Sequence, residues 1–531
     1  MAVKSEIEVT WKDLEVGSIV TEPGSAAQYQ TGGWRSQRPA YFKEEESVPS
    51  CKVYCPINQD IRKWLRLIRE EKFQEAWLEV LGKDPMPAII GRVCPHFCEQ
   101  NCNRKDFDEP VAIRSLEKFL GDEAMKKGWT LPARKIGPGA KKIAVIGSGP
   151  AGLACAFYLA REGYKITIYE ELPVIGGMLT VSIPDYRLPK TISGQEIEKN
   201  ILSLGITVEK NAKVDDTVLS DISKKFDAIF VAVGAQRSTK LNIEGENSRG
   251  VISGLEFLKK INLVEPLQMG NEVAIIGGGN TAIDAAHSAL KLGAKVTIYY
   301  RRSVKEMPAI ESEVAAAKKD GVKIQTLANP VRILVRNGRV IGLELVKMKL
   351  GEKDESGRAR PIPVQGSNFN VQADMVIAAI GEEERPDFGK ALEQNQKIFK
   401  GEVVGTVAAA LNCGGEAAKQ IMSYLKTGRR TPPKEKVHPR LVEFKDLNAY
   451  YLEHQPRQSR VTRPQSAVNE AFRCFSCGFC NMCGNCWMFC PDAAIAKTDG
   501  QFEINYFYCK GCAICQKECP RGAIYVMPEE E

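Results

Sequence analysis

The 531-residue sequence has few histidines, no long hydrophobic run and no apolar leader. No apolar segment approaches the roughly 20 residues that span a bilayer, so we expect no membrane-spanning helix. The N-terminus, MAVKSEIEVTWKDLEV, lacks an apolar signal core, and we therefore expect a cytoplasmic protein. With 4 histidines, the chain has little capacity for histidine-rich metal sites or for histidine acid–base catalysis.

Cysteine, in contrast, is abundant and clustered. Of the 17 cysteines, five lie in residues 51–102 and ten in residues 474–519, and only Cys155 and Cys413 stand apart. Cytosolic thiols stay reduced, so a metal or redox role is expected instead of disulfides. The formal charge of +7 counts these thiols as neutral. Thiolates carrying four iron–sulfur cores would bring the sum to about zero. We therefore predict no nucleic-acid partner.

Two segments, starting at residues 141 and 271, share the order strand, glycine turn, helix, strand. In the first, Gly147, Gly149 and Gly152 form a G-x-G-x-x-G pattern, and Glu170 follows 23 residues after Gly147. Glycines allow a tight turn and close approach of a pyrophosphate to a helix N-terminus, and a carboxylate at this spacing suits a ribose. The first segment thus predicts a dinucleotide site.

The second segment differs at the position that reads the ribose. Gly277 and Gly279 are followed by an alanine at the third position, and Tyr300 stands where the acid would be. Arg301 and Arg302 come next, and a guanidinium there suits the 2′-phosphate of NADP. We favour NADP over NAD, while the alternative is that one arginine is only a solvated strand end.

The C-terminal region contains the spacing C-x2-C-x2-C-x3-C-P twice. In this pattern three close cysteines hold one [4Fe–4S] cluster and the fourth ligates the other. Structural zinc sites instead use two separated pairs. The predicted ligands are Cys480, Cys483, Cys486 and Cys519 for one cluster, and Cys490, Cys509, Cys512 and Cys515 for the other.

Over residues 50–430 the sequence resembles the flavoprotein small subunit of glutamate synthase and its relatives. The resemblance is carried by VIGSGPAGL (145–153), GGMLTVSIPDYRLPK (176–190), AIIGGGNTAIDAA (274–286), YRRSVKEMPA (300–309) and TVAAALNCGGEAAKQI (406–421), with AVG (232–234) and AIG (379–381). It implies FAD at the first site and NADP or NAD at the second. Beyond the glycine turns, the implied cofactor contacts are Gly176, Gly177, Met178, Gly234, Asn280, Thr281, Gly381, Glu402 and Thr406.

One position departs from the family pattern. Relatives end the FAD domain with Gly-Asp, whereas this chain has Gly401-Glu402. The longer side chain should fit only if the backbone recedes, which leaves flavin affinity less certain than flavin identity.

The resemblance also assigns the N-terminal cysteines. It implies one [4Fe–4S] cluster held by Cys55, Cys94, Cys98 and Glu117, although Glu117 could instead be a solvated helix carboxylate. A further family cluster needs Cys51, Cys102 and an upstream pair within E-A-x-R-C-x-x-C. That signature occurs here at residues 470–477, so we infer that Cys474 and Cys477 fold back to complete this cluster. The alternative is that both are spare ferredoxin cysteines and that only three clusters exist.

The expected fold is α/β, with two Rossmann-type domains between two iron–sulfur domains. We predict a leader and helical iron–sulfur domain (1–131), an FAD domain (142–268 and 373–430) and an inserted NAD(P) domain (269–372). A linker (431–470) and a small α+β ferredoxin domain of the bacterial type (471–531) follow.

These parts predict electron transfer between NAD(P)H and a partner, because a flavin accepts a hydride pair and clusters carry single electrons. No side-chain acid or base is needed, so no catalytic residue is assigned. The tail at residues 506–530 resembles the ferredoxin-like subunit of 2-oxoacid:ferredoxin oxidoreductases, which favours such an enzyme as partner. A glutamate synthase-type partner and a stand-alone NAD(P)H:ferredoxin oxidoreductase stay open, as do the direction of electron flow and the oligomeric state.

Overall fold

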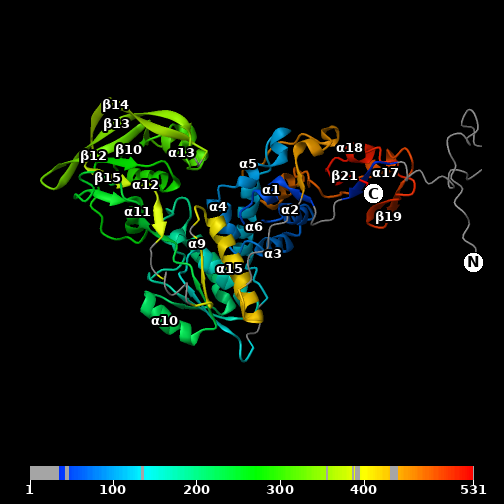
Figure 1. The fold of residues 1–531 in the computed structure, drawn as a ribbon, viewed down its shortest axis with the longest axis horizontal. Coiled ribbons are helices and arrows are strands. Elements are labelled where there is room, and N and C mark those ends of the chain that lie inside the picture. The colour runs from blue at the N-terminus through cyan, green and yellow to red at the C-terminus, as the bar shows by residue number, and fades with distance from the viewer. Residues whose placement is uncertain are drawn as a thin grey trace, which may run out of the picture.

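The computed structural model describes residues 35–41, 47–132, 137–354, 357–384, 388, 395–402, 404–430 and 440–529. Most of the expected leader, and residues 431–439 of the expected linker, lie outside the described residues. In Figure 1 the second dinucleotide unit and the C-terminal domain lie at opposite ends, with the helical domain and the first dinucleotide unit between them. Within the described part of the chain, no helix is both long and apolar enough to cross a membrane.

The helical domain is built from short amphipathic helices around one core. Its helices are α1 (Ser50–Val53), α2 (Ile61–Arg69), α3 (Phe73–Leu81), α4 (Pro87–Val93), α5 (Phe97–Gln100) and α6 (Ile113–Lys127). A seventh, α16 (Pro464–Phe472), packs on α2 through Ala467, Val468 and Ala471. Residues 464–470 were expected to belong to an extended linker. Their apolar positions recur at helical spacing and are buried in this core instead.

The first dinucleotide unit is a five-stranded parallel sheet with the order β17-β6-β3-β4-β5. Its strands are β3 (Lys142–Ile146), β4 (Lys165–Tyr169), β5 (Thr207–Glu209), β6 (Ala228–Val231) and β17 (Ile398–Lys400). Its helices are α7 (Pro150–Arg161), α8 (Met178–Val181), α9 (Lys190–Asn200), α10 (Asp216–Lys225) and α15 (Val407–Thr427).

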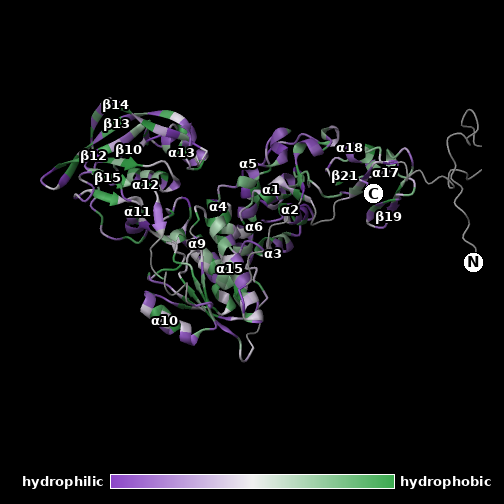
Figure 2. Cartoon of the chain, in the orientation of Figure 1, coloured by the Kyte–Doolittle hydropathy of each residue, from purple (hydrophilic) through white to green (hydrophobic). Residues whose placement is uncertain are grey.

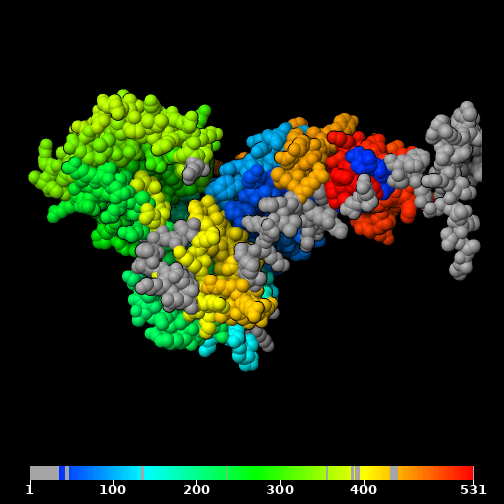
Figure 3. Space-filling model, viewed as in Figure 1, coloured from blue at the N-terminus to red at the C-terminus, as the bar shows by residue number. Residues whose placement is uncertain are grey.

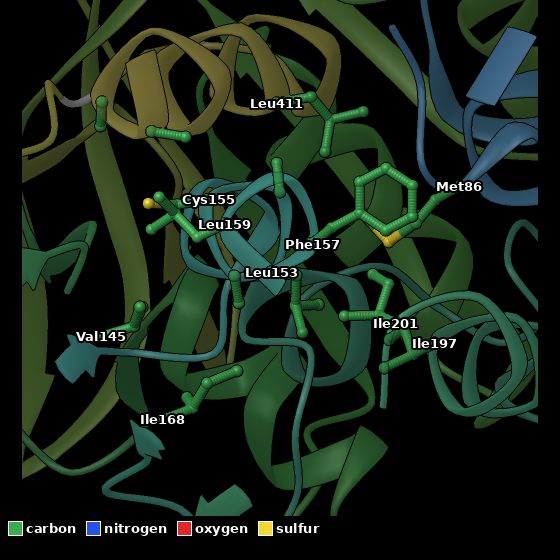
Figure 4. Packing of buried hydrophobic residues seen from close by; sticks show 14 of the residues in the cluster. Met86, Val145, Leu153, Cys155, Phe157, Leu159, Ile168, Ile197, Ile201 and Leu411 are labelled. Atoms are coloured by element: carbon green, nitrogen blue, oxygen red, sulfur yellow. The ribbon is translucent and has the colours of Figure 1, made fainter. Parts of the chain in front are cut away.

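The core of this unit extends into the helical domain. Figure 4 shows Phe157 of α7 beside Met86, which precedes α4, while Leu411 of α15 lies nearby. A Cβ on Gly414 would lie 2.1 Å from the Ala151 carbonyl oxygen, so glycine is required where α15 and α7 cross. Cys94 is part of the same buried cluster, which connects the N-terminal cysteines to the sheet.

The second dinucleotide unit has a five-stranded parallel sheet with the order β11-β10-β9-β15-β8. Its strands are β8 (Val251–Ser253), β9 (Glu272–Ile276), β10 (Lys295–Tyr300), β11 (Lys323–Thr326) and β15 (Met375–Ala378). Its helices are α11 (Gly254–Asn262), α12 (Asn280–Lys291) and α13 (Glu311–Lys319). Strands β10 and β15 are largely coloured as hydrophobic in Figure 2, as expected for a parallel sheet covered on its faces.

An antiparallel sheet of three strands, β12 (Ala328–Arg336), β13 (Arg339–Lys353) and β14 (Ala359–Gln372), extends this unit. The boundaries differ from those expected, because β15 pairs with both β8 and β9, which places β8 and β15 in the second sheet and not in the first. The change of unit occurs instead at a two-stranded ribbon of β7 (Ala235–Ser238) and β16 (Glu382–Glu384).

The C-terminal domain is completed by the N-terminal end of the described chain. It contains α17 (Asn485–Met488), β19 (Ile495–Thr498), β20 (Gln501–Ile504), α18 (Ile514–Lys517) and β21 (Ile524–Pro528). Strand β1 (Gln37–Tyr41) pairs antiparallel with β21, and β2 (Ser47–Pro49) pairs with β18 (Arg440–Val442). Figure 3 shows N-terminal residues in blue among the red C-terminal ones. Neither the pairing of β1 with β21 nor that of β2 with β18 was predicted from the sequence.

Candidate functional site: two glycine turns and four cysteine sets

The first glycine turn leaves open space at the N-terminus of α7. Gly147 has φ +101°, and an added Cβ would lie 2.5 Å from the Ala232 carbonyl oxygen. A Cβ on Gly152 would lie 2.0 Å from the Gly147 carbonyl oxygen, whereas one on Gly149 meets no atom within 4 Å. Two glycines therefore close the turn, and the third leaves room where a phosphate would approach the helix.

Glu170 lies at the end of β4 and is 5% exposed. Its carboxylate accepts hydrogen bonds from the backbone N–H and hydroxyl of Ser148, at 2.9 and 2.5 Å, and from the Leu172 N–H at 2.9 Å. We expected this group to bind a ribose. In the structure it also fixes the shape of the glycine turn, and three donors leave about one of its four acceptor positions for a ligand.

A cavity of about 450 Å³ opens beside this turn. Of the predicted cofactor contacts, Gly147, Gly149, Glu170, Gly177, Met178 and Gly234 line it. Gly176 holds the turn instead, because its N–H donates to the Ser148 carbonyl oxygen at 3.1 Å. The residues that line this cavity do not include Gly381, Glu402 or Thr406. Glu402 is exposed, and the Thr406 hydroxyl caps α15 by accepting from the Ala409 N–H.

Arg237, Lys259 and Phe388 also line the cavity and were not predicted. Arg237 belongs to the ribbon strand β7, and Lys259 lies on α11 of the second unit. None of these residues belongs to a glycine motif, so no local pattern marks them.

The second glycine turn repeats the first. Gly277 has φ +138°, and its added Cβ would lie 2.0 Å from the Ala379 carbonyl oxygen, while Gly279 has no neighbouring atom within 4 Å. Asn280 accepts a hydrogen bond from the Ile310 N–H at 3.0 Å, and the Thr281 hydroxyl donates to Glu382 at 3.2 Å. Asn280 and Thr281 therefore hold the surrounding loops, and the open space lies at Gly279.

The two arginines after β10 differ in surroundings. Arg302 is 4% exposed, its Nη2 lies 2.5 Å from Asp354, and its Nε donates to the Ala359 carbonyl oxygen at 2.8 Å. Arg301 is exposed. We expected both to be candidates for a 2′-phosphate. In this structure Arg302 joins β10 to the β13–β14 hairpin, and Arg301 is the guanidinium that a ligand can reach.

Side chains of the two dinucleotide units meet at a buried ion pair. The Arg187 Nη1 lies 2.7 Å from the Asp284 carboxylate, and the Tyr186 hydroxyl donates to the same carboxylate at 3.1 Å. Both charged side chains are less than a tenth exposed. The DYR stretch of the first unit therefore positions α12 and the second glycine turn relative to the first cavity.

The N-terminal cysteines, together with Cys474 and Cys477, lie in two groups. The first set is Cys55, Cys94, Cys98 and Glu117. Burial raises the pKa of the Cys98 thiol, and Cys55, Glu117 and Cys94 raise it further. These four side chains are therefore electrostatic neighbours in a buried site.

Glu117 is 3% exposed on α6, so it is not a solvated helix carboxylate. Burial raises its pKa to about 8, and its Oε2 lies 3.3 Å from His96 Nε2. The other ring nitrogen of His96 lies 2.5 Å from the Cys94 carbonyl oxygen, which requires a proton on that nitrogen. A buried carboxylate facing three thiols needs a proton or a cation beside it, and these donors fit an iron–sulfur cluster.

The second set is Cys51, Cys102, Cys474 and Cys477. All four line one cavity of about 30 Å³, together with Arg62 and apolar side chains of α2 and α6. Burial raises the pKa of the Cys51 thiol, and the other three thiols of the set raise it further. The two C-terminal cysteines of this set thus return to the N-terminal domain.

A buried network of charged side chains holds residues 470–477 against the N-terminal domain. Arg473 is 1% exposed and forms ion pairs with Glu470 at 2.9 Å and with Asp108 at 3.0 Å. Glu470 is fully buried and accepts hydrogen bonds from the backbone N–H groups of Ala112 and Gln458. The Glu and Arg of the E-A-x-R-C-x-x-C signature therefore fasten the two cysteines to the loop that follows Cys102.

In the C-terminal region, the last cysteine of each repeat lies near cysteines of the other repeat. The third set is Cys480, Cys483, Cys486 and Cys519, and the fourth set is Cys490, Cys509, Cys512 and Cys515. Burial raises the pKa of the Cys519 thiol, as do Cys483 and Cys480 from the other repeat. Burial likewise raises the pKa of Cys509, with a further contribution from Cys490.

Solvent exposure distinguishes the first and second cysteine sets from the third and fourth. Cys480, Cys483 and Cys512 are exposed, whereas no cysteine of the first two sets is. Within the described residues, no set is drawn together tightly enough to hold a single metal ion.

Comparison with known proteins identifies two parts of the chain. Residues 141–404 match the pyridine nucleotide-disulphide oxidoreductase family. Residues 45–129 match the family described as dihydropyrimidine dehydrogenase domain II, 4Fe-4S cluster.

Similar proteins include subunits of NADP-dependent and NADPH-dependent oxidoreductases. The NADP(+)-dependent formate dehydrogenase subunit beta of Moorella thermoacetica is 38% identical over 72% of this chain and 61% of its own length. The NADPH-Fe(3+) oxidoreductase subunit beta of Geobacter sulfurreducens is 42% identical over 67% of this chain and 54% of its own length. The chain thus spans little more than half of these relatives.

The small chain of the NADPH-dependent glutamate synthase of Escherichia coli is covered more completely. It is 36% identical over 63% of this chain and 74% of its own length. The protein therefore belongs to the FAD-dependent NAD(P)H oxidoreductases with iron–sulfur clusters that include the glutamate synthase small chain.

Proposed function

We propose that this chain carries electrons between NADPH and a partner enzyme through one FAD and four [4Fe–4S] clusters. The observation that carries the proposal is the continuity of the core. Cys94 and Ile57 pack in the same buried cluster as Val145 and Phe157 of the first dinucleotide unit. The second set then brings Cys51 and Cys102 together with Cys474 and Cys477, which directly precede the cysteines of the third and fourth sets. Such continuity suits a protein that conducts electrons along its length.

We assign FAD to the 450 Å³ cavity at Gly147, Gly149 and Glu170. The open space at Gly149, at the N-terminus of the twelve-residue helix α7, suits a pyrophosphate. Bound FAD would accept a hydride as an electron pair and release single electrons, which clusters can carry. The chain's own task is to hold the dinucleotide against the turn, with Glu170 fixing the turn and Gly177, Met178 and Gly234 bounding the cavity.

We assign NADPH to the second glycine turn, with Arg301 as the ligand of the 2′-phosphate. Tyr300 replaces the ribose-binding acid, which removes a negative charge that would repel this phosphate. The buried Arg302 is paired with Asp354, so Arg302 supports the hairpin and not the nucleotide. NAD in place of NADP remains the alternative for this site.

We assign one cluster to each of the four sets, which gives four complete ligand groups from fifteen cysteines and Glu117. The grouping of the thiols and the cavity between Cys51, Cys102, Cys474 and Cys477 support the count. None of the described cysteines is paired in a disulfide, and we propose a reducing compartment such as the cytoplasm for this protein.

The proposed partner is a 2-oxoacid oxidoreductase, because the C-terminal tail resembles the ferredoxin-like subunit of those enzymes. A glutamate synthase-type partner is the second candidate, favoured by the likeness to the glutamate synthase small chain. A diffusible ferredoxin is the third.

The test is anaerobic affinity isolation of the full chain from its native extract, with identification of the co-purifying subunits. A thiamine-dependent 2-oxoacid oxidoreductase would support the first partner and a glutamine-amidotransferase synthase the second. Isolation without a partner, together with rapid reduction of free ferredoxin, would overturn both and leave the third.

A further inference from the structure

The N-terminal strand β1 reaches the thiol of a predicted cluster ligand. The Tyr41 hydroxyl lies 3.1 Å from the Cys486 Sγ. Tyr41 is partly buried and packs against the apolar cluster that contains Cys486, Cys515 and Cys519. A tyrosine hydroxyl has an ordinary pKa of about 10 and carries its proton at neutral pH. It is therefore available as a donor to this sulfur.

Several contacts fix the position of this tyrosine. Tyr41 is opposite Ile524 in the antiparallel pairing of β1 with β21. Arg35 forms a two-pronged ion pair with Glu529, at 2.6 and 2.7 Å, and the Tyr506 hydroxyl donates to the Pro39 carbonyl oxygen at 2.9 Å. A slip of one residue would turn Tyr41 to the opposite face, so these contacts select the hydroxyl–sulfur pair.

Gly511, in the second cysteine repeat, contacts strand β1 at Gln37, the opposite end of the strand from Tyr41. An added Cβ there would lie 2.0 Å from the Gln37 carbonyl oxygen, and the Gln37 amide donates to the Gly511 carbonyl oxygen at 3.1 Å. Strand β1 thus contacts the cysteine-bearing loops as well as β21.

We propose that Tyr41 is a positioning residue that raises the reduction potential of the cluster held by the third set. This inference rests on the proposed function, which assigns a [4Fe–4S] cluster to that set. Reduction adds one electron, supplied ultimately by NADPH, and places more negative charge on the cysteine sulfurs. A hydrogen bond from Tyr41 to Cys486 stabilises this charge, so the reduced state is favoured while Tyr41 keeps its proton.

The test is a potentiometric titration of the full anaerobic chain, followed by electron paramagnetic resonance, comparing Tyr41→Phe with the unmodified protein. The phenylalanine keeps the ring and the strand pairing and removes only the donor. We expect one cluster to shift to a more negative midpoint potential, with iron content and the remaining signals unchanged.

Tyr506→Phe is the matched control, because it removes a hydroxyl that holds the same strand through a backbone oxygen instead of a sulfur. We expect no shift of the same cluster. No shift in Tyr41→Phe, or an equal shift in both variants, would overturn the inference, since the effect would then be absent or due to a loosened strand.

A Tyr41→3-fluorotyrosine variant gives the opposite sign and does not depend on removing the hydroxyl. Fluorine makes the phenol a stronger donor, so the same cluster should move to a more positive potential, and a negative or absent shift would contradict the proposal. If the unmodified protein has no cluster signal that depends on Cys486, the assignment of the cluster fails, and the role of Tyr41 fails with it. A signal that is present but does not shift overturns only the role of Tyr41.

Discussion

The two dinucleotide units have large apolar cores and share one buried ion pair, Arg187–Asp284, whereas the cysteine-bearing regions are joined by several buried charged contacts between segments that are distant in sequence. Phe157 and Phe230 are fully buried around the first parallel sheet. The second set instead depends on Arg473, which pairs with the nearby Glu470 and with Asp108, 365 residues away in the sequence. From this contrast we expect that loss of a cluster ligand or of a buried ion pair disturbs the cysteine-bearing regions more than the dinucleotide units.

The largest expected effect is the loss of one cluster from the buried cysteine region. Changing Cys474→Ser and Cys477→Ser together should remove about four irons per chain, because a [4Fe–4S] cluster loses two of its ligands. Flavin content should stay unchanged, since neither cysteine belongs to the apolar core of the first dinucleotide unit. Iron analysis with flavin absorbance checks this prediction.

The control for this change is Cys413→Ser, which alters a cysteine outside the four sets and should leave the iron content as it was. Unchanged iron in the double variant would mean that the second set holds no cluster.

The second prediction concerns flavin binding by the first dinucleotide unit. Gly149→Val should abolish most flavin binding while the iron content stays unchanged, because the side chain enters open space next to the α7 N-terminus. Gly149 has φ −66°, so the backbone accepts valine without strain. Flavin released from the denatured protein, measured by fluorescence, gives the result.

Gly194→Val is the matched control, because Gly194 on α9 also has no neighbouring atom within 4 Å and lies outside the cavity lining. Full flavin content in Gly149→Val would show that the dinucleotide lies elsewhere.

The next effect concerns stability. Arg473→Met should destabilise the chain by about 3–5 kcal/mol, because it leaves the buried carboxylate of Glu470 without its cation. Denaturant unfolding under anaerobic conditions checks this, and local hydrogen exchange should increase around α16 first. Lys224→Met, which breaks the exposed pair with Asp221, should leave the stability nearly unchanged. Equal effects of both changes would remove the distinction between buried and surface charges.

The smallest expected effect separates the two arginines of the second unit. Arg301→Ala should raise the KM for NADPH about tenfold to a hundredfold while changing that for NADH little, because a charged hydrogen bond to the 2′-phosphate is lost. Steady-state kinetics with both nucleotides measures this.

Arg302→Ala should instead lower the melting temperature, since Asp354 would lose its buried partner, and should leave the ratio of the two KM values unchanged. The reverse pattern would assign the phosphate to Arg302.

Features set by short local motifs could be predicted from the sequence, whereas strand pairings between distant segments could not. The glycine turns follow from residues within one strand–turn–helix unit, so Gly147, Gly149 and Gly152 could be recognised from spacing alone. The return of Cys474 and Cys477 was predictable only because the signature containing Glu470 and Arg473 accompanies them.

Other features depended on residues far apart in sequence. Asp354 pairs with Arg302 from the end of a hairpin strand, and β15 joins β8 and β9 across a long insertion. The pairing of β1 with β21 unites opposite ends of the chain, and residues 37–41 alone carry no pattern that selects this partner. Parallel and terminal pairings of this kind are set by tertiary packing, which single-sequence periodicity does not report.

The central claim is that one chain joins a flavin site to four clusters, and cofactor analysis of the anaerobically purified full-length protein tests it most directly. The account predicts about one FAD and about sixteen irons with an equal amount of labile sulfide per chain, since each [4Fe–4S] cluster contributes four of each. A folded preparation without flavin, or one whose iron and sulfide account for only the two C-terminal clusters, would contradict it.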